Sequence, residues 1–555
     1  MKPIKFQKLK RNWQKRHLFA LGGTFLTFFS VVSYADKQCS EDKHCLNIAT
    51  NDFTLDWHPI RVNTYPAQLL SRLTTEHLLE KVCIGDETTQ IPRPDMTGLF
   101  LKVCLSNAAD INDNNNYVDL RRIDQRRCPG LSVADLDFTL KQISRDSTND
   151  YNYFKLERAG TDLLVNNPTE ADATIIRQAI SFPIIRANAR YIANSRFGIG
   201  SEEDYNDLTH GHYQVKAFKA NVVDLERNRN KRKWVNITDI SLQFYPEREK
   251  LLEQMESRDV DVVLNLPTNI NPDITGRNYR QHASSELNNV TYIGFNFRTQ
   301  KPDLLELYNN KTFRRLFTVS VWATPVIQSK VNVSGRGKSD GIFYGEGFDP
   351  RSRQNTPLFL LNRDDDGQIM IKKKIQEFLR DNDINTRIPI RVLIHPSIYY
   401  LLTKGHIDEL ENQLTQMWTR WDNRRGLKFN FLNPVSPDKY TNHLNNGKGF
   451  EMLIDTLFFG ENSYKAMYLL LKGDPLNRLN NGVISASNIN RWLRQGPKGL
   501  ESFRKRVLET YPVAIIGSFP RRDYISTRIN LPKNRCPANS ALIPYTSIQD
   551  WRKKK

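Results

Sequence analysis

The stretch YVDLRRIDQRRCPGLSVADLDFTLKQI, residues 117–143, contains a strand-like run, a charged turn and a helix start in immediate succession. Residues 117–123 have the composition of a strand. The Ser132 hydroxyl group can cap the helix that follows, and Asp135 stands at the third helical position, which is a variant of the capping box. A strand that leads into a capped helix favours a chain of mixed α and β structure.

The same mixture continues along the rest of the chain. Strand-like segments are predicted at 99–105, 117–123, 213–218, 222–227, 240–245, 260–264, 290–297, 390–394, 428–432 and 514–517. Helices are predicted at 69–81, 133–144, 169–180, 248–257, 311–321, 369–381, 396–402, 407–420 and 499–510. Because strands and helices alternate throughout, we expect the α/β class, with some hairpin sheet in the first third.

Length and composition exclude two broad classes of protein. The chain has 555 residues, which suggests about three domains. Its 28 Phe, 21 Tyr and 8 Trp can fill real cores, so the chain is not wholly disordered. The mean hydropathy is −0.57, and beyond the N-terminus no run of apolar residues is long enough to span a bilayer, so a polytopic membrane protein is excluded.

The N-terminus has the layout of a secretory signal. Seven Lys and Arg and no acidic residue lie in 1–35, which leaves +12 of the formal net charge of +19 for the remainder. An apolar stretch, 18–32, and the small residues Ser33 and Ala35 follow the basic segment, so we expect a signal peptide over 1–35, cleaved after Ala35. An uncleaved anchor is the alternative, but the apolar stretch is short for a span. Export predicts a periplasmic protein of a Gram-negative cell.

Export makes the six cysteines interpretable. An even number in an oxidising compartment suggests disulfides, although six cysteines allow 15 connectivities. Cys83 and Cys104 lie in two strand-like runs and could pair across them, and Cys39 with Cys45 could close a small loop. Several free buried thiols are the alternative. A zinc site is less expected because the chain has no CxxC pair, and Cys39 has no lipobox before it, which argues against a lipid anchor.

Two basic runs have ordinary structural interpretations. Residues 227–233, RNRNKRK, are expected to form a solvated loop, and polyanion binding is the alternative. No pattern of stacking aromatics accompanies them, so nucleic acid is not expected as a partner. Residues 552–555 at the C-terminus are expected to be a frayed tail.

Nine segments in one order resemble a known family, the extracellular solute-binding proteins of peptide-type ABC transporters (bacterial family 5). Within them Asp56 and His58 fit the family's early turn, and Gly211 and Tyr213 fit its Gly-x-Tyr re-entry into a strand. The segments are LNIATNDFTLDWHP (46–59), TTEHLLE (74–80), 117–143, 210–230, LLEQMESRDVDVVLNLP (251–267), 291–321, GIFYGEGFDP (341–350), GFEMLIDTLFF (449–459) and YPVAIIG (511–517).

The resemblance implies a periplasmic-binding-protein-like fold of class II with an extra lobe, arranged as a three-lobed hinged clamp. Lobe I would comprise 36–75, 185–292 and 505–555, lobe II would be an insert over 76–184, and lobe III would span 293–504. A solute would bind between lobes I and III and be enclosed when the hinge shuts.

The implied function is binding without catalysis. The chain would carry a solute, most simply a short peptide, to a cognate ABC permease and ATPase for transmembrane transport, as a monomer that needs no cofactor. The family's Gly-Trp-x-x-Asp stretch reads here DTLFFGENSYKAM (455–467), so Glu461 is the nearest acid that could hold a ligand amine. Phe458, Phe459 and Trp322 could form an apolar wall. A loop role for Glu461 and core roles for the aromatics remain open, and so does the identity of the ligand.

Other functions remain as alternatives. His210 and His212 could point to a metal, or to a nickel-type or other small-solute carrier, but they supply only two ligands, so no metal site is predicted. A secreted enzyme is disfavoured because the chain has no Gly-x-Ser-x-Gly or His-Glu-x-x-His motif. The third hypothesis is a divergent family member with a non-transport role. Such a protein would be chaperone-like or would bind anionic envelope polymers through its net charge.

Overall fold

A computed structural model describes the following residues: 39, 42–51, 57–60, 64–77, 79–83, 99–103, 111–112, 117–119, 131–145, 155–159, 162–166, 183–187, 202–219, 221–230, 235–245, 247–267, 278–284, 289–330, 365–458 except 423, 434 and 436, then 484, 487–488, 491–492, 495–517, 521–531, 548 and 550–554. The predicted signal peptide, 1–35, and the predicted helix at 169–180 lie outside these ranges. Within them, no helix has the length and apolar character needed to cross a membrane.

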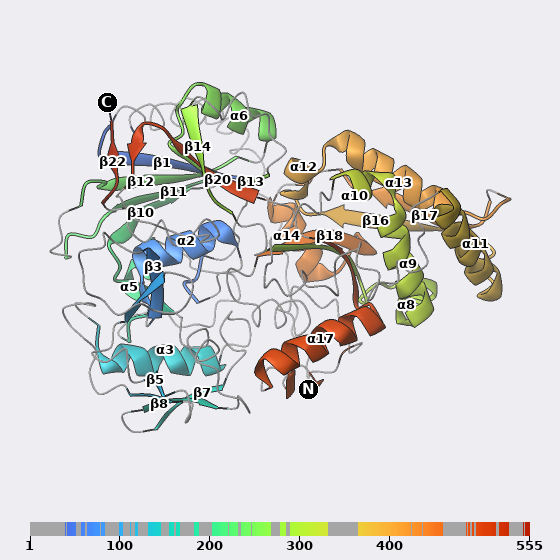
Figure 1. Cartoon of the computed structure of the whole chain (residues 1–555), viewed down its shortest axis with the longest axis horizontal. Helices are drawn as coiled ribbons and strands as arrows, with labels where there is room; N and C mark the ends of the chain where they lie inside the picture. The colour runs from blue at the N-terminus through green and yellow to red at the C-terminus, as the bar shows by residue number, and fades with distance from the viewer. Residues whose placement is uncertain are drawn as a thin grey trace, which may run out of the picture.

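Two large sheets stand side by side (Figure 1). The first has seven strands in the order β10-β11-β12-β1-β13-β20-β14. These are β10 (Tyr213–Lys219), β11 (Val222–Arg227), β12 (Asp239–Phe244), β1 (Cys45–Thr50), β13 (Val262–Pro267), β20 (Arg521–Ser526) and β14 (Tyr279–Ser284). The second has the order β17-β16-β18-β15-β19, with β17 (Gly426–Phe431), β16 (Arg387–Ile394), β18 (Met452–Phe458), β15 (Asn289–Phe295) and β19 (Val513–Gly517).

The two sheets share one topology. In the first sheet, β12, β1 and β13 are parallel. The strand β20 lies between β13 and β14 and is antiparallel to both. In the second, β17, β16 and β18 are parallel and β15 runs antiparallel between β18 and β19. Each antiparallel strand arrives from the other sheet, because the chain passes from β14 to β15 and returns from β19 to β20. The two halves are therefore joined by two crossings of the backbone.

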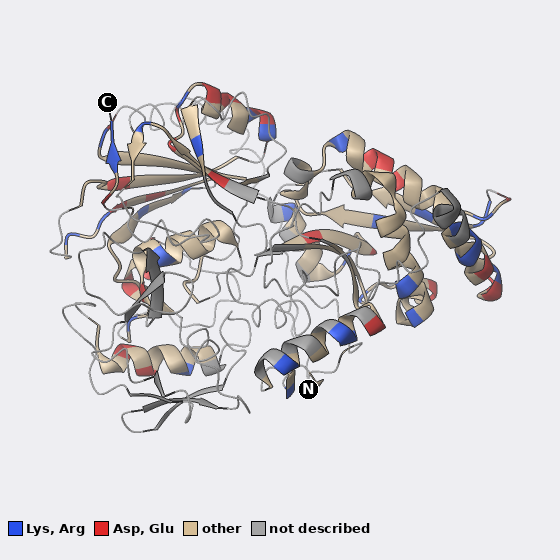
Figure 2. Cartoon of the chain, viewed as in Figure 1, with Lys and Arg blue, Asp and Glu red and all other residues tan. Residues whose placement is uncertain are grey.

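Helices cover both sheets and bury the apolar residues of the strands. The first sheet packs against α2 (Tyr65–Thr74) through one cluster of buried apolar residues. It packs against α6 (Arg248–Glu256) through a second, separate cluster. The second packs on α8 (Pro302–Asn309), α9 (Lys311–Ala323), α10 (Pro325–Lys330), α11 (Asp365–Asp381) and α13 (Lys404–Trp418). The aromatic centre of the second core brings the rings of Phe313 and Trp418 to 5.2 Å. Charged side chains gather on outer helices such as α6, α11 and α17 (Gly496–Thr510), whereas the strands are mainly uncharged (Figure 2).

A third group of elements lies in the stretch predicted as lobe II. It contains two further sheets, the pair β3-β4 and the four-stranded β5-β6-β8-β7. Its elements are β3 (Leu79–Cys83), β4 (Leu99–Val103), β5 (Ile111–Asn112), β6 (Tyr117–Asp119), α3 (Val133–Arg145), β7 (Lys155–Ala159) and β8 (Asp162–Asn166). The stretch begins and ends at one place, since β2 (Glu76–His77) pairs with β9 (Pro183–Ile184).

The predicted capping box at the start of α3 is confirmed. The Asp135 N–H donates to the Ser132 Oγ over 3.2 Å, and the Ser132 N–H donates to Asp135 Oδ2 over 2.8 Å. The other carboxylate oxygen, Oδ1, accepts the Ala187 N–H at 2.7 Å. The same carboxylate therefore caps the helix and fixes the chain that leaves the third group of elements.

The remaining elements are short and complete the description: α5 (Glu202–Leu208), α12 (Ile398–Leu401), α14 (Pro437–Asn446), β21 (Ile529–Asn530) and β22 (Arg552–Lys553).

Two sequence-based predictions of local structure are wrong. The helix expected over 69–81 runs only from Tyr65 to Thr74, because Pro66 starts it earlier and the next residues pair as β2 and β3. The C-terminal tail is not frayed over its whole length. β22 pairs with β21, and Lys553 is buried where three oxygen atoms accept its ammonium group.

Two stretches that the sequence assigns to lobe I, 289–292 and 513–517, belong to β15 and β19 of the second sheet. The cause is the exchange of antiparallel strands described above, since the chain passes between the sheets after β14 and after β19. The extent of the three lobes stays a prediction.

The predicted Cys39–Cys45 disulfide is present, with the two Cα atoms 5.1 Å apart. Cys83 lies at the end of β3, opposite Leu99 of β4. Its suggested partner Cys104 lies outside the described residues, so that pairing stays a prediction.

Candidate functional site

The parallel strands of the two sheets end where the two halves meet. In open α/β sheets, ligands bind outside the carboxyl ends of the strands, at the point where the strand order reverses. That point falls at β1 and β13 in the first sheet and at β16 and β18 in the second. The helix α12, which follows β16, contacts β13 of the other sheet. Figure 1 shows β13 directed toward α12. The carboxyl ends of the two sheets therefore bound one region, which is the candidate site.

The hydrogen bonds of the strands give equivalent positions in the two halves. The Asn47 N–H of β1 donates to Asp261, the residue before β13, and the Asn47 carbonyl accepts the Asp261 N–H. The Arg391 N–H of β16 donates to Glu451, the residue before β18, and its carbonyl accepts the Glu451 N–H. Asn47 and Arg391 therefore occupy equivalent positions in the two sheets. Four residues after each of them the strand has ended, and the chain reaches the candidate site at residues 51 and 395.

Those equivalent positions carry two neutral polar side chains, Asn51 and His395. Asn51 is the first residue after β1 and is 1% exposed. His395 is the first residue after β16, and its backbone N–H donates to the Ile454 carbonyl at 2.9 Å. Both side chains therefore come from strand ends that the sheets hold in register.

The tautomer of His395 follows from its surroundings. The backbone N–H of Ser397 donates to His395 Nδ1 over 3.2 Å, so Nδ1 acts as an acceptor and the neutral ring carries its proton on Nε2. The Ser397 hydroxyl lies 2.6 Å from the same Nδ1. The Tyr440 ring meets the imidazole edge-on, with centroids 5.0 Å apart. The imidazole is therefore positioned by the chain that leads into α12.

Two buried phenols flank Asp455 in the middle of β18. Burial, and then the nearby Asp455 carboxylate, raise the pKa of Tyr292 and of Tyr440 well above the usual value. Both hydroxyl groups therefore stay protonated at neutral pH. The two tyrosines therefore offer neutral hydroxyl groups for hydrogen bonding and not phenolate anions.

The residues predicted for the site are only partly described. Phe458 is the last residue of β18 and pairs in register with Asn289, so it ends at the strand edge that borders the candidate site. Trp322 is half-buried near the end of α9. Phe459 and Glu461 lie outside the described residues. Sequence reasoning missed Asn51 and His395, since only the strand pairing shows that they occupy equivalent ends.

The histidine pair flanking Gly211 lies elsewhere. His210 is buried, and its Nε2 lies 3.1 Å from the Ile184 carbonyl oxygen at the base of the third group of elements. Among the described residues, no group of three or more His, Cys, Asp or Glu side chains is arranged to hold a metal ion.

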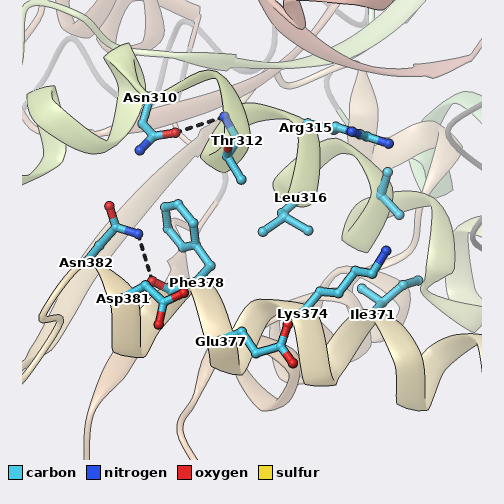
Figure 3. A pocket seen from close by; sticks show the side chains of 11 residues that line it. Asn310, Thr312, Arg315, Leu316, Ile371, Lys374, Glu377, Phe378, Asp381 and Asn382 are labelled. Carbon is cyan, nitrogen blue, oxygen red and sulfur yellow. Dashed lines mark hydrogen bonds between the residues drawn. The ribbon is translucent and has the colours of Figure 1, made fainter.

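A pocket of about 450 Å³ lies away from this region, between α9 and α11 (Figure 3). Leu316, Phe378 and other apolar side chains form its floor. Arg315 and Lys374 lie at one end and Asp381 at the other (Figure 3). The two helices belong to the outer part of the second half, so this groove is separate from the facing strand ends.

Comparison with known proteins identifies the fold. No protein-family model matches the chain, and no curated protein matches its sequence. Solved structures do match. The periplasmic binding protein AgaA from A. tumefaciens R10, in complex with agropinic acid, is 13% identical, with a TM-score of 0.63 over 92% of this chain and 99% of that one. The oligopeptide-binding protein AppA from Bacillus subtilis, in complex with a nonapeptide, is 13% identical, with a TM-score of 0.60 over 92% and 99%.

A third similar structure has a different kind of ligand. NikA from Staphylococcus aureus, in complex with nickel and histidine, is 12% identical, with a TM-score of 0.58 over 92% of this chain and 100% of that one. The chain therefore has the α/β fold of periplasmic-binding-protein-like substrate-binding proteins, which confirms the fold predicted from the family resemblance. The similar structures are those of binding proteins rather than enzymes.

Proposed function

We propose that this chain is the substrate-binding component of an ABC importer and binds a small solute between the carboxyl ends of its two sheets. The observation that carries the proposal is the shared topology of the two halves, with two backbone crossings and with the strand ends facing one region. A fold shared over nine-tenths of the chain with substrate-binding proteins supports it. Membership of family 5 and delivery to a cognate permease and ATPase are part of the proposal.

A short peptide is the proposed solute. The polar groups described at the strand ends, Asn51, His395 and Ser397, are neutral and can both donate and accept hydrogen bonds. Such groups suit the uncharged main chain of a peptide better than a bare cation. Peptides are the ligands named for AppA, whereas agropinic acid and a nickel complex are named for AgaA and NikA. The latter two classes are the alternatives.

The clamp is proposed to have three lobes that close around the solute. The third group of elements, over 76–184, would be the extra lobe, and closure would occur about the two backbone crossings, from β14 to β15 and from β19 to β20. Phe458, Phe459 and Trp322 would provide apolar wall, and Glu461 would meet a ligand amine. The protein would act as a monomer in the periplasm after removal of residues 1–35.

Two measurements test the proposed function. Mass spectrometry of the solute released by denaturing the purified protein should identify one class of compound. The protein, refolded without that solute, is then screened by thermal shift against peptides of two to nine residues, agropinic acid and nickel with histidine. A specific solute at a hundred times its Kd should stabilise the fold by about 2.7 kcal/mol. Failure of every solute class to bind, or turnover of a peptide, would overturn the proposal.

A further inference from the structure

The side chain of Asn51 is buried, with 1% of its surface exposed. Within the part of the chain that the structure describes, neither its Nδ2 nor its Oδ1 has a hydrogen-bond partner. A buried amide that leaves water without gaining a partner destabilises the folded state. Buried polar groups in native proteins are nearly always bonded, so an orphaned amide calls for an explanation.

Asn47 provides the comparison within the same strand. It is also 1% exposed, but its Nδ2 donates to the Asp259 carbonyl at 2.8 Å, and its N–H and carbonyl bond Asp261. Asn47 is the third residue of β1, and Asn51 is the first residue after that strand. The two asparagines are equally buried. Among the described residues, Nδ2 of Asn47 has a partner and its Oδ1 has none, whereas neither side-chain atom of Asn51 has one.

The position of Asn51 provides the second observation. It follows the carboxyl end of β1 at the point where the strand order reverses, and it is equivalent to His395 in the other sheet. A side-chain amide holds an NH₂ donor group and a carbonyl acceptor side by side in one plane. A ligand group that presents a carbonyl oxygen and an N–H side by side can satisfy both together.

We propose that Asn51 holds the bound solute by its main chain, with Nδ2 donating to the carbonyl oxygen and Oδ1 accepting the N–H of one residue in an extended segment. The solute class is therefore a compound with two consecutive secondary amides, as in a peptide. This inference rests on the proposed function and narrows it. The two hydrogen bonds of Asn51 would then form on binding rather than on folding.

Stability of the solute-free protein provides the first test. Asn51→Leu keeps the approximate shape and removes both polar atoms, so it should leave Tm unchanged or raise it slightly. The matched control Asn47→Leu breaks a made hydrogen bond and should lower Tm by several degrees. If Asn51→Leu lowers Tm as much as Asn47→Leu does, Asn51 is a structural residue and the inference is overturned.

Binding provides the second test, with the synthetic peptide that gives the largest thermal shift as the probe. Asn51→Leu and Asn51→Asp should weaken its binding ten- to a hundred-fold, whereas Asn47→Leu should change it less than twofold. Methylating each peptide N–H in turn should reveal one position where methylation weakens binding to the wild type but not to Asn51→Leu. Equal affinity of wild type and Asn51→Leu overturns this inference alone. Absence of binding by every peptide overturns both this inference and the proposed peptide ligand.

Discussion

Asp261 and Glu451 occupy the same position in the two halves of the molecule, and each is held by two cations. Each is the residue before the third parallel strand, and each accepts an N–H from the first strand, at 3.0 Å from Asn47 and 2.7 Å from Arg391. Lys553 and Arg528 bond Asp261, and Lys301 and Arg391 bond Glu451. These carboxylates lie at the amino ends of the strands, opposite the candidate site, so their role is to fix the sheets.

Glu451 should make stability depend on pH. Its side chain is 2% exposed. Burial alone would raise its pKa, but hydrogen bonds from Arg391 and Lys301 outweigh that effect and hold the pKa below the ordinary value of 4.5. The ionised carboxylate therefore stabilises the fold above pH 4.5, and this stabilisation is lost as the pH falls through the lower folded pKa.

Glu451→Gln should consequently lower the free energy of unfolding by about 2 kcal/mol at pH 7, and by much less near pH 3. Urea unfolding at both pH values measures the difference. Glu256→Gln, on the exposed end of α6, is the control and should have little effect at either pH. A loss that is the same at pH 7 and pH 3 would show that the charge of Glu451 does not matter.

Lys553 should be needed for the first half to fold stably. Its ammonium group is buried and donates to Asp261 at 2.8 Å and to the carbonyls of Cys39 and Cys45. Lys553→Met would leave Asp261 buried without that cation and should cost about 3 kcal/mol. Lys554→Met, at the next and exposed position, should cost less than about 0.5 kcal/mol. Equal unfolding midpoints for the two variants would refute the assignment.

Gly211 should be irreplaceable because of a close backbone approach. A Cβ there would lie 2.6 Å from the Leu73 carbonyl oxygen, and the Gly211 N–H donates to the Thr74 carbonyl at the end of α2. Gly211→Ala should therefore destabilise the protein by about 2–3 kcal/mol. Gly405→Ala in α13, where a Cβ would make only an ordinary contact with the Thr403 Oγ1 at 3.9 Å, should be neutral or stabilising by up to about 1 kcal/mol. Thermal unfolding of both variants checks the prediction, which fails if Gly211→Ala is tolerated equally well.

Much of the fold could be predicted from the sequence. The strand runs at 213–218 and 222–227 and the capped helix at Ser132 carry strong local signals, and the structure confirms them. The helix expected over 69–81 failed because pairing of β2 with β9 and of β3 with β4 overrides a local helical pattern. The placement of β15 and β19 in the second sheet could not be predicted, because an exchange of strands between sheets leaves no local signal.

The candidate site could be predicted only in part. Phe458 falls at a relevant strand edge, whereas Asn51 lies among ordinary polar residues of a loop start. The role proposed for Asn51 depends on its burial and on its lack of partners among the described residues, and neither can be recognised in the sequence. Lys553 was misassigned for the same reason: in sequence it belongs to a basic tail, and only tertiary packing brings it to Asp261.

Amide hydrogen exchange with and without a saturating solute tests the central claim most directly. We predict that the solute slows exchange in the segments that follow β1 and β16, around Asn51 and 395–397, and leaves 310–319 and 371–382 unchanged. Protection confined to the groove between α9 and α11, with none at the strand ends, would contradict the account.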